Sequence, residues 1–220
     1  MVTSKLPTAM TPSSFVKALQ RIESDHAFNP YADRCPAYDR EDAPERRSKI
    51  LLAVLEAALA QSVDSLWVGR DFGYRGGRRT GLAFTDDDHL PEHAKRWGLT
   101  LQSPTRGGMA GERSARAVWN VLSRVDVPVF LWNVFPLHPH EPGNPFSNRK
   151  HNARECASGE GILSLLVQML EPSRIVAVGR DAAWTASRLF ARYEILAVRH
   201  PSHGGQKIFT DRMSEWYGLA

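Results

Sequence analysis

Cysteine is scarce in this chain, whose 220 residues include only Cys35 and Cys156. A structural zinc site or an iron–sulfur cluster normally takes about four protein ligands, so a site built on thiolates alone is excluded. A single disulfide could join the two cysteines, but free thiols in a reducing compartment are the expected state.

Long apolar runs and targeting patterns are missing as well. The longest apolar stretch, residues 50–60, contains Glu56 and falls well short of the roughly 20 residues that span a membrane. Residues 1–10 lack the basic and then apolar pattern of a secretory signal. We therefore expect a cytoplasmic protein with no membrane partner.

Neither sign of charge dominates, because 28 Lys and Arg face 24 Asp and Glu, for a formal charge of +4 and a pI of about 9.3. This small excess permits a nucleic-acid partner without demanding one. The length suits one domain with a sizeable core. We predict a monomer with a single domain over residues 1–220, in which residues 1–43 form an N-terminal helix and loop extension.

Hydrophobic periodicity predicts alternating strands and helices. Strands are expected over residues 65–69, 127–133, 174–179 and 194–199. Helices are expected over residues 12–24, 44–61, 90–97, 111–124, 154–171, 181–192 and 207–217. Residues 29–44 hold three prolines and are predicted to form an ordered surface loop. The fold expected is α/β, a central four-stranded, mostly parallel sheet with helices on both faces.

Sheets of this kind bind ligands beyond the carboxyl ends of their strands, and polar residues or glycines follow all four predicted strands. The first strand is followed by Asp71 and Tyr74, and the second ends in Asn133. The third leads into Gly179-Arg180-Asp181, and the fourth into residues 200–205. We expect these four segments to converge on one crevice.

The stretch from Gly69 to Phe84 carries the most specific pattern, G-x-D-x-x-x-x-x-G-x-x-x-G-L-x-F. This pattern resembles the water-activating motif of the uracil-DNA glycosylase superfamily. Leu131-Trp132-Asn133 is similar to that family's base-reading strand, and His200-Pro201-Ser202 to its last loop. Val176–Gly179 resembles the strand that leads into its phosphate loop. The resemblance spans roughly residues 50–215 and identifies the chain as an atypical branch.

The resemblance implies a hydrolase that removes uracil from DNA without a cofactor or metal. Cleavage of the N-glycosidic bond builds a cationic sugar and an anionic base. Asp71 is the expected carboxylate beside the sugar, and His200 the expected donor at O2 of the base. The amide of Asn133 suits the mixed donor and acceptor edge of uracil, and Phe84 offers a ring for stacking. The remaining expected substrate contacts are Arg70, Phe72, Gly73 and Tyr74.

Backbone N–H groups around Gly179, Ser202, Gly204 and Gly205 are expected to clamp DNA phosphates. Arg180, Lys207 and the arginines at 75, 78 and 79 would add positive charge, although these three arginines suit a solvated loop equally well. The DNA contacts expected are Gly179, Arg180, Ser202, His203, Gly204, Gly205, Gln206 and Lys207.

The chain departs from the family pattern at two positions. Gly73 stands where the family keeps a tyrosine beside C5 of uracil, so small 5-substituents should enter unless Tyr74 or Phe72 fills the space. Gly204 stands where the family has an apolar wedge that fills the gap left by the extruded base, so His203 or Gln206 would take that place. The proline-rich segment 138–148 has no clear counterpart.

Two other functions stay open at this point. The histidines at 138, 140, 151, 200 and 203 raise the alternative of a metal-dependent hydrolase. A protein that binds uracil in DNA without cleaving it is the second alternative. Single residues also have structural interpretations, because Asp71 could cap a turn and Asn133 could bond to neighbouring backbone.

Overall fold

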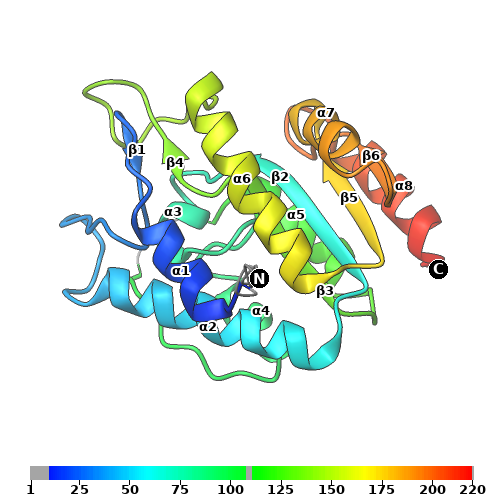
Figure 1. The fold of residues 1–220 in the computed structure, drawn as a ribbon, viewed down its shortest axis with the longest axis horizontal. Helices are drawn as coiled ribbons and strands as arrows, with labels where there is room; N and C mark the ends of the chain where they lie inside the picture. The colour runs from blue at the N-terminus through cyan, green and yellow to red at the C-terminus, as the bar shows by residue number, and fades with distance from the viewer. Residues whose placement is uncertain (1–9, 108–110, 220) are drawn as a thin grey trace, which may run out of the picture.

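The computed structural model describes residues 10–107 and 111–219 as fourteen elements in an α/β arrangement (Figure 1). The first nine residues of the predicted extension lie outside the described ranges. The strands are β1 (Ala27–Phe28), β2 (Ser65–Asp71), β3 (Val129–Phe135), β4 (His138–Pro139), β5 (Arg174–Val178) and β6 (Glu194–Val198). The helices are α1 (Pro12–Gln20), α2 (Ala43–Gln61), α3 (Gly77–Thr80), α4 (Leu90–Arg96), α5 (Arg113–Leu122), α6 (Ala153–Leu170), α7 (Arg180–Leu189) and α8 (Gln206–Tyr217).

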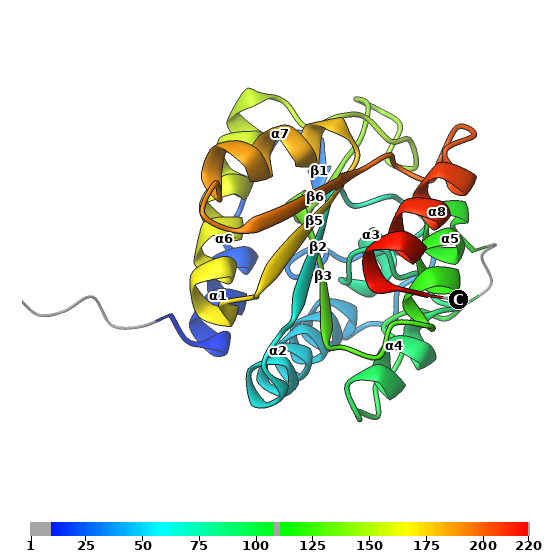
Figure 2. The ribbon, with the colours of Figure 1, turned by 90° about the vertical axis from the view of Figure 1, so that its right-hand side faces the viewer.

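The central sheet has four parallel strands in the order β3-β2-β5-β6. Figure 2 shows it edge-on, with α1, α6 and α7 on one side and α4, α5 and α8 on the other. Strand β3 is buried along its length and apolar apart from Asn133, and β2 is buried from Ser65 to Gly69, as expected for parallel strands covered on both faces. The predicted fold class and all four predicted strands are confirmed.

Strands β2 and β3 both run two residues further than the sequence indicates. Strand β2 ends at Asp71, so this carboxylate belongs to the strand and not to the following loop. Strand β3 ends at Phe135, which places Asn133 inside the strand, paired in register with Gly69. The prediction that Asn133 ends the strand is therefore wrong, because Val134 and Phe135 are apolar and keep their place in the ladder.

A second, two-stranded sheet was not expected from the sequence. Strands β1 and β4 pair antiparallel, with Phe28 opposite His138. They join the N-terminal extension to the segment that follows β3 (Figure 1). Each strand has only two residues, which is too short for any alternation of polar and apolar residues to reveal it.

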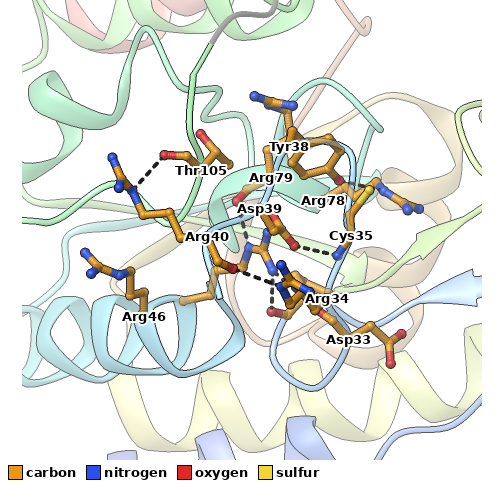
Figure 3. A network of polar contacts seen from close by, with 12 residues as sticks. Asp33, Arg34, Cys35, Tyr38, Asp39, Arg40, Arg46, Arg78, Arg79 and Thr105 are labelled. Carbon is orange, nitrogen blue, oxygen red and sulfur yellow. Dashed lines mark hydrogen bonds and ion pairs between the residues drawn. The ribbon is translucent and has the colours of Figure 1, made fainter. Parts of the chain in front are cut away.

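The loop before α2 is more buried than a surface loop. Asp39 is fully buried and forms an ion pair with Arg47 of α2, which is also fully buried. Asp39 accepts a hydrogen bond from the backbone N–H of Cys35 at 2.8 Å, and Arg47 Nε donates to the carbonyl of Arg79 at 2.7 Å (Figure 3). The loop is thereby fixed against α3, which lies within the Gly69–Phe84 motif. Within the described residues, no helix has the length and apolar character needed to cross a membrane.

Candidate functional site

Asp71 sits at the carboxyl end of β2 with both carboxylate oxygens engaged. Its Oδ2 accepts from Nε of Arg70 at 2.6 Å, and its Oδ1 accepts from Nδ1 of His151. The side chains of Asp71 and His151 are only 4% and 5% exposed, respectively. A buried carboxylate needs such partners, and these two bonds hold the side chain of Asp71 in one orientation.

His151 is the functional residue that the sequence interpretation missed. It had been considered only among the candidate metal ligands. It comes just before α6, whose first turn is fixed by a capping box between Asn152 and Glu155. Arg149 pairs with Glu155 at 2.6 Å, so the segment that carries His151 is held on both sides. No sequence pattern joins positions 71 and 151, because their contact depends on where α6 docks on the sheet.

Gly69, Asn133 and Phe84 form a tight group next to Asp71. A Cβ atom added at Gly69 would lie 2.3 Å from Oδ1 of Asn133 and 2.5 Å from Cζ of Phe84. Gly69 and Asp71 are two residues apart on one strand, so they face the same side of the sheet at roughly 7 Å. The missing side chain at Gly69 therefore lets the amide and the ring meet beside the carboxylate.

The amide of Asn133 has no hydrogen-bond partner among the described residues, although the residue is only 3% exposed. The alternative of a bond to neighbouring backbone therefore lacks support. Buried amides are nearly always paired, so an amide left open next to a half-exposed ring is typical of a ligand contact. Phe84 has a φ of 51°. This left-handed conformation is strained for an aromatic residue and is found most often at functional sites.

His200 follows β6 and is held as a neutral imidazole with a defined tautomer. The backbone N–H of Ser202 donates to Nδ1 at 3.2 Å, so Nδ1 is an acceptor and the ring proton lies on Nε2. Burial, together with the positive charge of Arg70, lowers the pKa of His200 to about 4. The ring is thus a neutral donor through Nε2.

The loops after β5 and β6 lie side by side, since a Cβ at Gly179 would be 3.4 Å from Cβ of His200. Of the four residues around which N–H groups are expected to clamp phosphate, three have their own N–H bonded within the protein. Gly179 donates to the carbonyl of Val198, Ser202 donates to His200, and Gly205 donates to the carbonyl of Ser202. These bonds shape the loop, and only the N–H of Gly204 is left without a partner among the described residues.

The other predicted DNA contacts lie at the amino-terminal ends of α7 and α8. Arg180 is the first residue of α7, and Gln206 and Lys207 begin α8. All three are exposed, as are His203 and Gly204. Lys207 pairs with Asp211 one helical turn further along, at 2.6 Å. The first N–H groups of a helix lack intrahelical partners, so these two helix starts offer donors beside exposed cations.

Arg78 and Arg79 are neither solvated nor available to phosphate, as they are only 3% and 0% exposed. Arg78 donates to the hydroxyl of Tyr38 at 2.8 Å, and Arg79 pairs with Asp87 at 2.6 Å. Figure 3 shows both arginines close to Tyr38. Both sequence interpretations of these two residues are therefore wrong, because both side chains contact Tyr38, which comes from a distant part of the chain. Arg75 alone of the group is exposed.

Three predicted substrate contacts surround the start of the motif loop. The ring of Phe72 is buried and packs on Gly77, where a Cβ would lie 2.4 Å from the ring. The backbone N–H of Tyr74 donates to Asn148, and the Tyr74 hydroxyl accepts from Nε of Arg75 at 2.7 Å. Gly73 lies beside the carboxyl of Glu112. The ring of Phe72 thus stabilises the loop from the core side.

The histidines do not gather into a metal centre. Within the described ranges, no group of three or more His, Cys, Asp or Glu side chains lies close enough to hold a metal ion. His138 lies between Arg78 and the carbonyl of Ser147, and burial lowers its pKa to about 3. His151 bonds to Asp71.

The family model described as the uracil DNA glycosylase superfamily matches residues 60–214. Among solved structures, wild-type SMUG2 from Pedobacter heparinus is similar with a TM-score of 0.63 at 16% identity, over 96% of this chain and 98% of that one. The UNG structure from Nitratifractor salsuginis gives a TM-score of 0.44 at 14% identity, over 82% and 84% of the two chains. No curated protein matches the chain. At this identity, the likeness to SMUG2 concerns the fold.

Proposed function

Since the chain belongs to the uracil DNA glycosylase superfamily, we propose that it extrudes uracil from DNA and hydrolyses its N-glycosidic bond, leaving an abasic site. We further propose that it does so as a cytoplasmic monomer without a cofactor. Uracil is proposed as the substrate base because the Asn133 amide has no hydrogen-bond partner among the described residues. The amide lies on the same side of the sheet as Asp71, and it borders the space above Gly69 that the Phe84 ring also borders.

An asparagine amide donates from nitrogen and accepts at oxygen. It can therefore pair with O4 and N3–H of uracil together, whereas cytosine presents the reversed pattern and would leave both groups unsatisfied. Phe84 offers its half-exposed ring to the face of the extruded base. The base is held in this way on one edge and on one face.

Asp71 and His200 supply opposite halves of the charge stabilisation. As the bond breaks, positive charge develops on the sugar, where the carboxylate of Asp71 stabilises it and orients a water molecule. Negative charge develops on the base, where Nε2–H of His200 donates to O2. Because His200 is neutral before the reaction, it donates this bond without first losing a proton.

The DNA backbone would follow the amino-terminal ends of α7 and α8, where Arg180 and Lys207 are exposed. Helix starts bind phosphates through unpaired N–H groups, and exposed cations add affinity that falls with salt. His203 and Gln206 are the exposed side chains of this loop that can enter the gap left by the base.

Single-turnover cleavage of an oligonucleotide with one uracil tests the proposal. Wild-type protein should produce an abasic site that alkali converts to a strand break, with and without EDTA. Asp71→Asn should slow this by on the order of 10² or more while binding stays similar. Loss of activity with EDTA would favour a metal-dependent hydrolase. Tight uracil-specific binding without cleavage would favour a non-catalytic binding protein.

A further inference from the structure

We propose that Glu112 is the specificity-determining residue at the C5 edge of the base, where its carboxyl excludes a 5-methyl group. This inference rests on the proposed function and extends it to the choice between uracil and thymine. Nothing in the sequence pattern marks Glu112, which lies outside the Gly69–Phe84 motif and just before α5.

Three parts of uracil already have a proposed contact in the protein, which leaves its C5–C6 edge. N1 of uracil carries the sugar, near Asp71. O2 is assigned to His200, and N3–H with O4 to Asn133. Only the C5–C6 edge is left without a protein contact. We assign the surface beside Gly73 to this edge, because Gly73 comes two residues after Asp71 at the end of β2.

Gly73 itself has no side chain, but the space beside it is occupied. A Cβ atom at Gly73 would lie 3.0 Å from Oε1 and 3.2 Å from Oε2 of Glu112. At Gly76 a Cβ would lie 2.1 Å from Oε2 of the same carboxyl. The opening that the sequence predicts at Gly73 is therefore filled by a residue from another part of the chain.

The Glu112 carboxyl is held in place. The hydroxyl of Ser114 donates to Oε1 at 2.5 Å, and the backbone N–H of Glu112 donates to Asp86 at 2.6 Å. Glu112 is the residue just before α5, and its carboxyl accepts no capping hydrogen bond from a backbone N–H of that helix. With Oε1 bonded to Ser114, the carboxyl lies beside the two glycines.

The helix that carries Glu112 is fixed to the stacking residue. Nε1 of Trp119 donates to the carbonyl of Phe84 at 2.9 Å, one of the contacts that dock α5 against the segment after the motif. The distance between the ring of Phe84 and the wall at Glu112 is therefore set by the fold. Burial raises the pKa of the Glu112 carboxyl, and the nearby charge of Asp86 raises it further.

A carboxyl in this position discriminates by size and by polarity. The C5–H of uracil fits against an oxygen, but a methyl group needs space that the fixed carboxyl already occupies. It would also leave the oxygens against an apolar group. One methyl in a shaped pocket changes the rate ratio of two substrates by about 10- to 200-fold.

The test compares single-turnover cleavage of uracil and of thymine in single-stranded oligonucleotides, where extrusion breaks no base pair. Wild type should strongly prefer uracil. Glu112→Ala should slow uracil cleavage severalfold, because the base loses one wall, and raise the thymine-to-uracil rate ratio about 10-fold or more. Glu112→Gln keeps the shape and should keep the wild-type ratio. Glu92→Ala removes an exposed carboxylate on α4 and serves as the control.

An unchanged ratio in Glu112→Ala, with a melting temperature near that of wild type, would overturn the proposal. Wild type that cleaves both bases equally would also overturn it. A ratio that rises as far in Glu112→Gln as in Glu112→Ala would keep Glu112 as the determinant and assign the effect to its charge.

Binding separates this inference from the proposed function. In an Asp71→Asn background, affinities for oligonucleotides with one uracil or one thymine are compared with and without Glu112→Ala. If wild type cleaves neither base, the proposed function is wrong. The role of Glu112 is then tested by the ratio of the two affinities alone. The ratio should approach 1 only when Glu112 is replaced.

Discussion

Nδ1 of His151 donates a hydrogen bond to Oδ1 of Asp71, and both side chains are almost wholly buried. The two residues lie 80 positions apart in the sequence. Arg70 bonds to the other carboxylate oxygen, so the two bonds together fix the rotamer of Asp71. His151 is therefore a positioning residue that acts through Asp71.

Replacing His151 by Ala should lower the single-turnover rate of uracil cleavage by about 10- to 100-fold, because small displacements of a reacting group cost up to about 10²-fold. Affinity for uracil-containing DNA should stay within a few fold. The matched control is His140→Ala, since among the described residues the His140 side chain bonds only to loop backbone. His151→Asn, which keeps a donor, should recover part of the rate. A His151→Ala rate equal to that of the control would contradict the positioning role.

Asn133→Ala should abolish discrimination between uracil and cytosine and remove most uracil cleavage. The fold should survive, because the amide makes no hydrogen bond to a described residue that its loss would break. Cleavage assays and a thermal melt check the two halves of the prediction. If the melting temperature collapses instead, Asn133 is a structural residue and the assignment to the base edge is wrong.

Gly69→Ala should disrupt the site while leaving most of the sheet intact. The new Cβ would meet Asn133 and Phe84 at 2.3 and 2.5 Å, so both must move. We expect a loss of cleavage similar to that of Asn133→Ala. Gly161→Ala is the matched control, because a Cβ there meets no atom within 4 Å. Equal activity of the two variants would show that the base does not enter beside Gly69.

His200→Ala should slow cleavage less for bases that are more acidic leaving groups, since their anions carry less charge for Nε2–H to stabilise. A series of substituted uracils in single strands, measured at single turnover, provides the comparison. An equal loss across the series would exclude a bond to the leaving base.

The protonation state of His200 can be followed directly by NMR of the ring nitrogens. Its pKa of about 4 lies below the ordinary value of 6.5, so the ring should stay neutral down to pH 5, with the proton on Nε2. The contribution of His200 to cleavage should then show no change between pH 8 and pH 5. A charged ring at pH 6, or a proton on Nδ1, would contradict the role derived from the Ser202 bond.

The sequence by itself determined the fold class and indicated most of the residues that we propose take part in the reaction. The four strands could be predicted because parallel strands covered on both faces are rich in apolar residues, as Leu66–Val68 of β2 and Ile175–Val178 of β5 show. Asp71 and His200 could be proposed because the motifs that contain them resemble those of the uracil DNA glycosylase superfamily. These features depend on neighbouring residues, so local pattern is sufficient.

The tertiary structure alone decided which side chains surround those residues. His151 reaches Asp71, Glu112 fills the space at Gly73, and Arg78 and Arg79 turn inward to Tyr38. Each contact joins parts of the chain that only the docking of helices and loops brings together. The sequence does not distinguish a charged residue that faces solvent or DNA from one that pairs with a buried partner. In this protein the packing of α5, α6 and the N-terminal loop determines which of these occurs.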